Sequence, residues 1–590
     1  MDFCRQVSEM HLALWVVPTL MAILVSAIGS RLSRRVLAVL SIAGLAIPFA
    51  QACAAVVFFM WGQSSALVNL IEIETLTMGR RFALSFVLDA KGAWATLLCM
   101  TIALAAQTHA IASVARLAGR HRYHALILAL AGGGGLLFCG RSMVPVLIGW
   151  EGLALAGAFL AGFWESEESG GRTGMRWLLF QRGSGVLLLL GFLALEINDT
   201  IGAVFIVAAV SLRAGQVPFH GWIPGSTRAP SSTTALVHGV GSLLAATFLL
   251  DRFWHLIALS DFLPELIGIM GASGVVLGIL AGLQQHRPQK ILGWMFMLYG
   301  GLAWLGFAIG DPVAARMIVT GSALALSGLV LVVGTSSGQI AEFEMALGRA
   351  RSRPARRAYM VLWAALALPP SLTFLALGRL CGFAPQTTLG LLIQLLVVLC
   401  MLAVGWILRN VFESHKGQRP TNPKHVSKWM SAAPAGLGAA AFVLGLIAFF
   451  THRKSEYIFG GMSGLGWAGI AAGSMVLGWL LAWWIKRGSS GIFVGRLSYS
   501  QRAMDRVAGT GLGIGEMIVV LPVFLLRAVG VVFWRGIGDF VLDTLIFGTA
   551  VRSIEGIGTV LRYIQNGRIQ RYALVVVLAT LLLVLVMLRY

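Results

Sequence analysis

The sequence predicts an all-α polytopic membrane protein with about 16 transmembrane helices, since each span takes roughly 20 apolar residues and such runs recur along the chain. Of the 590 residues, 58% are hydrophobic and only 12% are charged, whereas a soluble domain has about twice that charged fraction. The mean hydropathy is +0.83. The net charge of +21 is concentrated between the apolar runs, which indicates basic loops at a membrane surface and excludes a nucleic-acid partner.

The predicted spans follow one another through short loops. They cover 12–29, 36–61, 82–106, 124–140, 143–163, 177–195, 199–222, 231–256, 265–284, 290–310, 312–336, 357–378, 387–408, 432–451, 462–485 and 570–589. Pro218 is expected to break the seventh helix because proline removes a backbone donor, and the twelfth helix is also expected to be broken. Broken helices at membrane depth are typical of transport sites.

Residues 496–569 differ from these runs because a charge interrupts them every several residues. This pattern predicts a long amphipathic helix, or a kinked pair broken at Pro522, along the membrane surface. A helix of about fifty residues would reach roughly 75 Å, far enough to contact neighbouring subunits. The alternative is one more ordinary span near 515–534.

The expected organisation has six parts. They are spans 1–3 (1–122), a first antiporter-like half with spans 4–8 (123–256), a second half with spans 9–13 (257–410), spans 14–15 (411–495), the lateral surface helix (496–569) and a C-terminal anchoring span (570–590). Alternate loops are rich in arginine and lysine, so the positive-inside rule places both termini on the outer face and the lateral helix on the cytoplasmic face. The first apolar run has no basic segment before it and is expected to be a retained span.

Charged residues within apolar runs are the candidates for chemistry, because ionisable groups at membrane depth are costly and mark ion or proton paths. Glu151 lies inside the fifth span and Arg213 inside the seventh. We expect Arg213 to hold Glu151 ionised, either in a proton path or as a structural tie between two spans. His238 in the eighth span suits proton relay, since its ordinary pKa is near 6.5. Arg182, near the start of the sixth span, is either part of the path or an interfacial anchor.

Four motifs resemble the antiporter-type proton-translocating subunits of respiratory complex I. They are Gly149-Trp150-Glu151-Gly152 in span five, Gln181-Arg182 in span six, Arg213 with Gly215-Gln216-Val217-Pro218 in span seven, and Ala235 to His238 in span eight. The closing Ile564 to Leu574, ahead of a final apolar run, resembles subunit L of NADH-quinone oxidoreductase. The resemblance implies a charge network for proton translocation, comprising Glu151, Arg182, Arg213, His238, Lys290, Arg316 and Arg379.

The chain is a divergent member of the family that it resembles. Arg213 stands where the family has a lysine, Arg379 likewise replaces a lysine in span twelve, and the acidic residues beside it are gone. In span eleven, Gly321 and Ala325 lie near the positions of the family's histidine and lysine. Since a guanidinium effectively keeps its proton, we expect the arginines to act as fixed charges and His238 to be the group that titrates.

The resemblance implies a membrane-arm subunit of an NADH:quinone oxidoreductase in the bacterial inner membrane, where proton translocation is coupled to electron transfer. Partner subunits would hold NADH, FMN, iron–sulfur clusters and quinone. The chain itself shows no strand–GxGxxG–helix unit, and its six scattered cysteines form no C-x-x-C pair, so no cofactor or metal is expected in it. The alternatives are a subunit of a cation/proton antiporter, of a membrane-bound hydrogenase or of an inorganic-carbon uptake complex, or a structural paralogue that does not pump.

Overall fold

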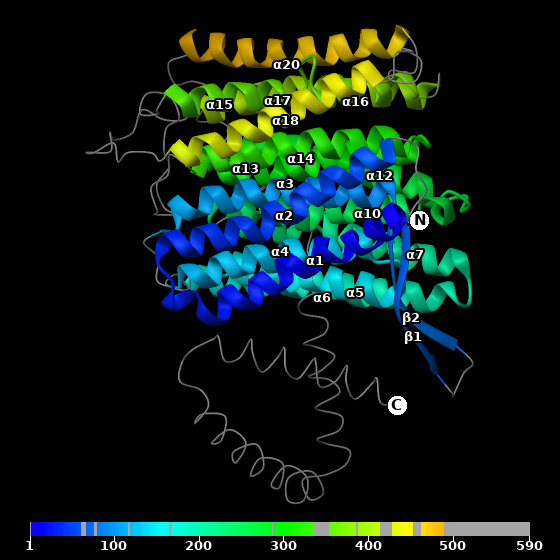
Figure 1. Cartoon of the computed structure of the whole chain (residues 1–590). Coiled ribbons are helices and arrows are strands. Elements are labelled where there is room, and N and C mark those ends of the chain that lie inside the picture. The colour runs from blue at the N-terminus through cyan, green and yellow to red at the C-terminus, as the bar shows by residue number, and fades with distance from the viewer. Residues whose placement is uncertain are drawn as a thin grey trace, which may run out of the picture.

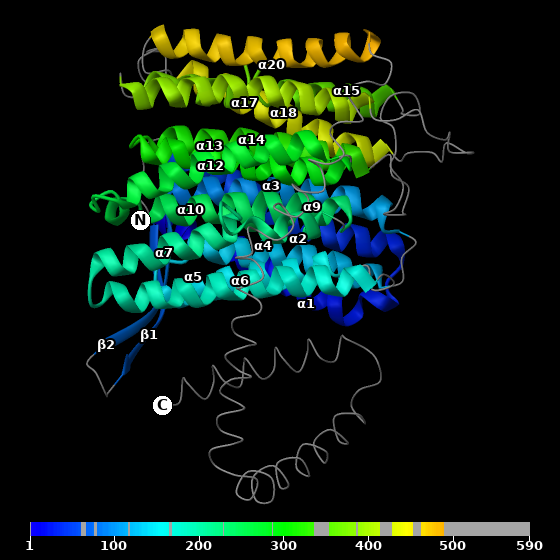
Figure 2. The same ribbon diagram turned by 180° about the vertical axis from the view of Figure 1, so that it is seen from behind.

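The computed structural model describes residues 2–60, 66–75, 80–115, 119–163, 168–227, 229–285, 287–334, 353–384, 387–413, 428–451 and 462–488. Figure 1 shows their helices side by side in one bundle, with a β-hairpin projecting beyond its edge. Seen from behind in Figure 2, α20, α17 and α18 again lie at one side of the bundle and α1, α5 and α6 at the other. The predicted lateral helix at 496–569 and the last span at 570–589 fall outside the described residues.

The first part of the chain supplies seven long helices and the hairpin. They are α1 (Asp2–Ile28), η1 (Gly29–Arg31), α2 (Arg34–Met60), β1 (Ala66–Thr75), β2 (Arg80–Leu88), α3 (Ala90–Ser113), α4 (Arg120–Cys139), α5 (Met143–Ala161), α6 (Glu168–Leu195) and α7 (Asp199–Ala214). A broken segment follows, made of η2 (His220–Trp222), α8 (Ile223–Ser226), α9 (Ser231–Leu236), the π-helix η3 (Val237–Leu244), α10 (Ala245–Arg252) and α11 (Trp254–Ile257).

The second part is again helical. It contains α12 (Leu263–Gln284), α13 (Pro288–Ala308), α14 (Pro312–Gly334), α15 (Arg353–Ala364), α16 (Leu372–Gly382), α17 (Thr388–Glu413), α18 (Lys428–Thr451) and α20 (Met462–Gly488). Thirteen helical segments among the described residues are long and apolar enough to cross a membrane, with α9, η3 and α10 counted as one. Together with the shorter α7 and the broken pair α15–α16, they coincide with the first fifteen predicted spans, so the fold class is confirmed.

The hairpin corrects the predicted start of the third span, which was placed at residue 82. Strands β1 and β2 pair antiparallel, from Ala66 opposite Leu88 to Thr75 opposite Arg80. Helix α3 starts only at Ala90, because the Asp89 carboxylate accepts a hydrogen bond of 2.6 Å from the Gly92 amide. Such a cap satisfies a free amide at a helix start.

Both predicted helix breaks are confirmed. After α7, Gly215 adopts φ +64°, a left-handed conformation that ends the helix, and the Val217–Pro218 peptide follows. The second break separates α15 from α16 and contains the Pro369–Pro370 peptide. There the Ser371 hydroxyl accepts a hydrogen bond of 3.1 Å from the Phe374 amide and starts α16.

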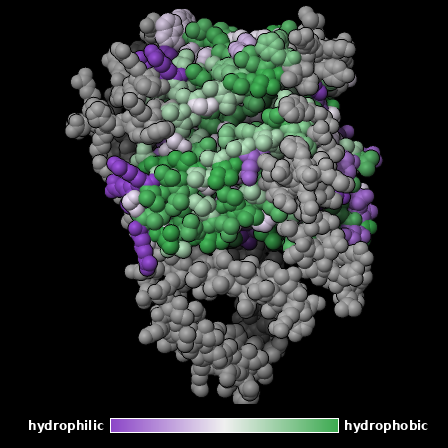
Figure 3. All heavy atoms as spheres, in the orientation of Figure 1, coloured by the Kyte–Doolittle hydropathy of each residue, from purple (hydrophilic) through white to green (hydrophobic). Residues whose placement is uncertain are grey.

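The core lies around the eighth span, in which every residue from Ser231 to Asp251 is buried. Helices α13 and α14 pack against it and are almost as deeply buried. Helices at the sides of the bundle expose leucines instead, as α17 does at Leu391, Leu395 and Leu399. In Figure 3, hydrophobic side chains cover the middle of the visible face and hydrophilic ones gather toward the helix ends. This surface suits a lipid bilayer.

Candidate functional site

Arg213 is the most deeply buried charge at the break in span seven, with none of its side chain exposed. Its guanidinium carbon lies 3.8 Å from the centre of the Trp150 ring. Nη2 donates to the Trp150 carbonyl oxygen at 2.8 Å, and Nη1 donates to the Gly241 carbonyl oxygen at 3.5 Å. A cation–π contact and two backbone acceptors therefore hold this charge between α5 and η3.

Glu151 pairs with Arg182, and this corrects the expected pairing with Arg213. Arg182 Nη1 lies 2.6 Å from Glu151 Oε2, and Arg213 forms no ion pair with Glu151 within 4 Å. The carboxylate lies directly over Gly185 of α6, where a Cβ atom would collide with Oε1. Arg182 is thus not merely an interfacial anchor, because it neutralises the acidic group of α5.

Two hydrogen bonds tie the helix break to the neighbouring helices. The Ser242 hydroxyl donates to the Arg213 carbonyl oxygen at 3.0 Å, and Gln216 Nε2 donates to the Met297 carbonyl oxygen at 3.1 Å. Because irregular backbone persists at membrane depth only when buried in protein or facing water, these contacts from η3 and α13 keep the break in the bundle interior.

His238 lies in the π-helix η3, two residues after α9 ends. Its Nε2 is 2.9 Å from the Ser226 hydroxyl, which belongs to the short α8 after the break. The imidazole stacks between Trp222 and Phe296, with ring centres 5.2 and 5.6 Å away. π-helical turns often occur at functional sites. The structure therefore joins His238 to the broken segment through Ser226 and Trp222, and to α13 through Phe296.

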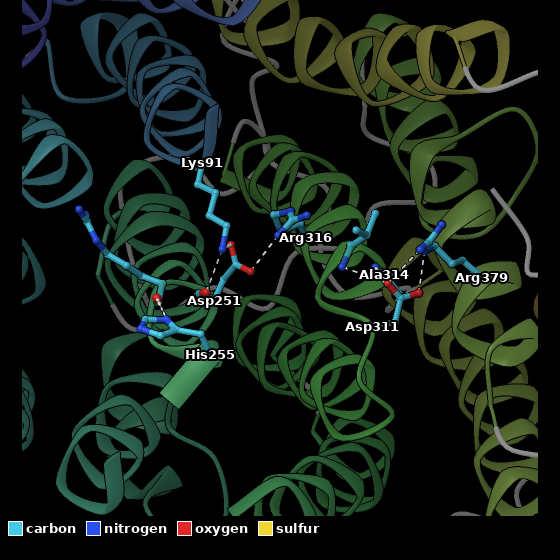
Figure 4. Close-up of polar contacts among 9 residues, drawn as sticks. Lys91, Asp251, His255, Asp311, Ala314, Arg316 and Arg379 are labelled. Atoms are coloured by element: carbon cyan, nitrogen blue, oxygen red, sulfur yellow. Dashed lines mark hydrogen bonds and ion pairs between the residues drawn. The ribbon is translucent and has the colours of Figure 1, made fainter. Parts of the chain in front are cut away.

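The remaining predicted residues lie at the two ends of span eight. Lys290 is half-buried in the first turn of α13, where the neighbouring Gln289 donates to Ser231 at 2.8 Å. Arg316 and Arg379 lie at the opposite end and pair with carboxylates that the sequence analysis did not select. Figure 4 shows both pairs.

Asp251 and Asp311 are these missed carboxylates. Arg316 Nη1 donates to Asp251 Oδ1 at 2.8 Å, and Lys91 Nζ lies 3.2 Å from Asp251 Oδ2. Arg379 donates through Nε to Asp311 Oδ2 at 2.6 Å and through Nη2 to Oδ1 at 3.1 Å. The acidic partner missing from span twelve is therefore supplied by the start of α14. An aspartate at the end of an apolar run was the available sequence signal in both cases.

The centre of span eleven is filled by close helix contacts instead of ionisable groups. A Cβ atom at Gly321 would meet Thr373 of α16, and Ala325 is fully buried. Ser327 donates to the Ala235 carbonyl oxygen at 3.4 Å. Small residues allow helices to approach closely in a membrane. Neighbouring helices therefore occupy the space that the family's histidine and lysine would fill.

A further buried polar cluster, also missed, lies near the start of α9. Tyr123 bonds the hydroxyls of Ser232 and Thr233 at 2.6 and 2.8 Å, and Gln107 Nε2 lies 2.8 Å from His124 Nδ1. These groups come from α3, α4 and α9. The sequence shows histidine, tyrosine and serine within these apolar runs. Their spacing follows no regular pattern, so it does not indicate that they meet at one site.

Broken spans seven and twelve around buried charges define an antiporter-like polytopic membrane protein. Residues 141–414 match the family model described as "NADH:quinone oxidoreductase/Mrp antiporter, TM". The match covers a little under half of the chain, and the resemblance to the antiporter-type subunits of complex I is confirmed.

Individual relatives include both respiratory and antiporter proteins. NADH-quinone oxidoreductase subunit N of Hirschia baltica is 23% identical over 320 residues, covering 50% of this chain and 67% of that protein. Subunit L of Pseudomonas aeruginosa is 24% identical, covering 30% and 32%. A probable K(+)/H(+) antiporter protein of Rhizobium meliloti is 24% identical, covering 33% and 22%.

The fold is also that of a solved antiporter complex. The structure of the Mrp complex from Dietzia sp. matches with a TM-score of 0.63 at 17% identity, over 97% of this chain and 63% of that chain. The chain thus spans less than two thirds of that structure and about a third or less of the subunit L and K(+)/H(+) antiporter relatives. The likeness establishes the arrangement of helices.

Proposed function

We propose that the chain is the proton-translocating, antiporter-like subunit of a complex I-like NADH:quinone oxidoreductase. The observation that carries the proposal is Arg213, a fully buried guanidinium at a helix break beside the Glu151–Arg182 pair. Ionisable groups inside a membrane are costly and are retained mainly for ion or proton paths. A purely structural protein has no need of a charge at this place.

The buried groups divide between carriers and fixed charges. The imidazole of His238 is a group that can accept and release a proton, whereas the guanidinium of Arg213 keeps its own. In the proposed mechanism, protons move through water and His238, while Arg213 sets the electrostatic barrier at the break. The carboxylates of Glu151, Asp251 and Asp311 neutralise the positive charges of the arginines that they pair with along this path.

The Glu151–Arg182 pair also supports the presence of a partner. Both residues lie near the middle of their spans, yet the side chains are 26% and 40% exposed. Charges at this depth avoid lipid, so we propose that another membrane-arm protein covers the pair. Contact through residues 496–569 is part of the same proposal, and NADH, FMN, iron–sulfur clusters and quinone would bind in partners.

The proposed location is the bacterial inner membrane. The excess of basic residues in alternate loops supports an orientation with both termini on the outer face and residues 496–569 on the cytoplasmic face. In this orientation, the polar cluster near the start of α9 and Lys290 lie toward the cytoplasm, and Asp251 and Asp311 lie toward the outer face.

Membership of a cation/proton antiporter complex is the second candidate function. Two observations favour it, the K(+)/H(+) antiporter relative and the fold shared with an Mrp complex. The two functions differ in driving force, since the first needs electron transfer and the second needs an ion gradient.

Glu151→Gln in the assembled complex tests both functions. We expect electron transfer from NADH to quinone to continue while the number of protons moved per electron falls, because Arg182 loses its counter-charge. Glu265→Gln, at an exposed position in the first turn of α12, is the matched control. Unchanged proton transfer in the Glu151→Gln complex would overturn the first function, and proton transfer driven by Na⁺ or K⁺ without NADH would establish the second.

A further inference from the structure

Lys91 places an amine at one end of the charge network, where the other ion pairs of the described spans use guanidinium groups. It lies in the first turn of α3. Its Nζ donates to the Asp251 carbonyl oxygen at 3.1 Å and lies 3.2 Å from Asp251 Oδ2. Figure 4 shows Asp251 between Lys91 and Arg316.

The two cations hold the Asp251 carboxylate differently. Arg316 donates a hydrogen bond of 2.8 Å to Oδ1, whereas Oδ2 has no hydrogen-bond partner in the described structure and faces the amine only as an ion-pair contact. Loss of the Lys91 proton would therefore leave Asp251 still neutralised and hydrogen-bonded by Arg316. The carboxylate does not depend on Lys91 for its charge balance.

Lys91 is the cation of this cluster that is chemically able to give up a proton. Two cations and one carboxylate sum to +1, and excess charge next to a low-dielectric interior is unfavourable. An arginine cannot relieve it, because a guanidinium effectively keeps its proton, but a lysine amine can. Lys91 is 43% exposed and Asp251 only 1%, so the amine lies between the buried carboxylate and the end of the bundle.

Neighbouring contacts hold this arrangement in place. Trp94 Nε1, one turn after Lys91, donates to the Thr320 hydroxyl at 2.7 Å, and that hydroxyl donates to the Arg316 carbonyl oxygen at 2.7 Å. Helices α3 and α14 are thus tied together directly beside the ion pairs.

Other charges face the same end of the bundle. Asp89 caps α3, and its charge and that of Arg141 act on Arg252. Asp311 is bound by Arg379. Asp251 is the carboxylate that an ion pair joins to Lys91.

We propose that Lys91 is the proton-releasing group of this chain, an inference that rests on the proposed function. In this step the ammonium Nζ–H bond breaks and the proton passes to water at the end of the bundle. The electron pair stays on the neutral amine, and Asp251 stays paired with Arg316. A proton arriving from the bundle interior recharges the amine and returns the cluster to +1.

The test compares Lys91→Arg with Arg357→Lys, an exchange at an exposed residue of α15 outside the charge network, in the assembled complex. Lys91→Arg keeps the charge and the ion pair, but the ordinary pKa of arginine exceeds that of lysine by more than about two units, so release slows by about 100-fold or more. We expect proton transfer per electron to collapse in Lys91→Arg and to stay near wild type in Arg357→Lys, with normal assembly of both.

A purely structural Lys91 predicts a different pattern, in which Lys91→Arg pumps normally because the ion pair is kept. That outcome would overturn the inference. Raising the pH on the outer face of oriented vesicles to about pH 9 should not restore proton transfer in Lys91→Arg, since a guanidinium stays protonated at that pH. Glu151→Gln, measured in parallel, separates the two proposals. If Glu151→Gln stops proton transfer and Lys91→Arg does not, Lys91 is not the releasing group and the proposed function stands.

Discussion

Asp311, at the start of α14, binds Arg379 of α16 through two hydrogen bonds of 2.6 and 3.1 Å. The guanidinium also lies 4.5 Å from the centre of the Phe383 ring. Span twelve is broken just before α16, so the ion pair ties its second half to span eleven. A lysine in the same place could donate to the carboxylate but could not form this bidentate pair, in which two nitrogens bind the two oxygens.

Removal of the Asp311 charge should destabilise the bundle. In Asp311→Asn, the largely buried Arg379 loses the carboxylate that it binds through two hydrogen bonds, and breaking one side of a buried pair costs about 3–5 kcal/mol. We expect a lower unfolding temperature of the detergent-solubilised complex. Arg379→Lys keeps the charge, so it should lower the unfolding temperature much less. Equal unfolding temperatures for Asp311→Asn and wild type would show that the pair does not stabilise the fold.

Gly185 should be essential for the Glu151–Arg182 pair. A methyl group at residue 185 would occupy the position of the Glu151 carboxylate, so Gly185→Ala should displace it and reduce proton transfer as Glu151→Gln does. At Gly183 the methyl would meet only the tip of Leu212, 3.0 Å away, which can move. Gly183→Ala is therefore the control. The prediction fails if both alanine variants transfer protons equally well.

Arg213→Lys should keep proton transfer, because a lysine retains the positive charge at the break. The ammonium can still reach the Trp150 carbonyl oxygen but loses the planar stacking and the second backbone acceptor. Hydrogen bonds of charged groups contribute about 1.5–3 kcal/mol each, so thermal stability should fall measurably. Arg213→Gln removes the charge and should stop proton transfer, and normal transfer in that variant would argue against an electrostatic role.

The positions of the spans were predictable because hydrophobic run length alone determines them, and the break at Pro218 follows from the missing backbone donor. The hairpin at 66–88 was not predictable. Phe82 to Leu88 read as the start of an apolar span, and only the cap at Asp89 separates strand from helix.

The ion pairs depended on geometry that the sequence does not contain. Glu151 and Arg182 meet because α5 and α6 pack side by side with Gly185 between them. Asp251 and Asp311 lie at apolar run ends, where an acidic residue normally suggests a loop. Their burial against α3 and α16 comes from the packing of distant spans, so nothing local in the chain identifies their partners.

Two glycines should control how α17 packs against α20. A Cβ atom at Gly405 would collide with the backbone of Met475, and one at Gly478 with the backbone of Leu402. Since backbone cannot move aside as a side chain does, Gly478→Ala should separate the helices and lower the assembled fraction on a native gel. Gly473→Ala on the same helix has no atom within 4 Å and is the control. Equal assembly of the two variants would contradict this packing.

His238→Phe should separate proton transfer from packing at the core of the bundle. Phenylalanine can keep the stacking between Trp222 and Phe296 but cannot carry a proton, and it leaves the Ser226 hydroxyl with its bond to the Ile223 carbonyl oxygen. Assembly should therefore be normal while proton transfer per electron falls by about 100-fold or more, since a positioned acid–base group contributes about 100-fold to 10,000-fold. Ser226→Ala removes only the hydrogen-bond partner and should give a smaller loss. Normal proton transfer by an assembled His238→Phe complex would mean that the imidazole is a packing residue and that protons pass Arg213 through water alone.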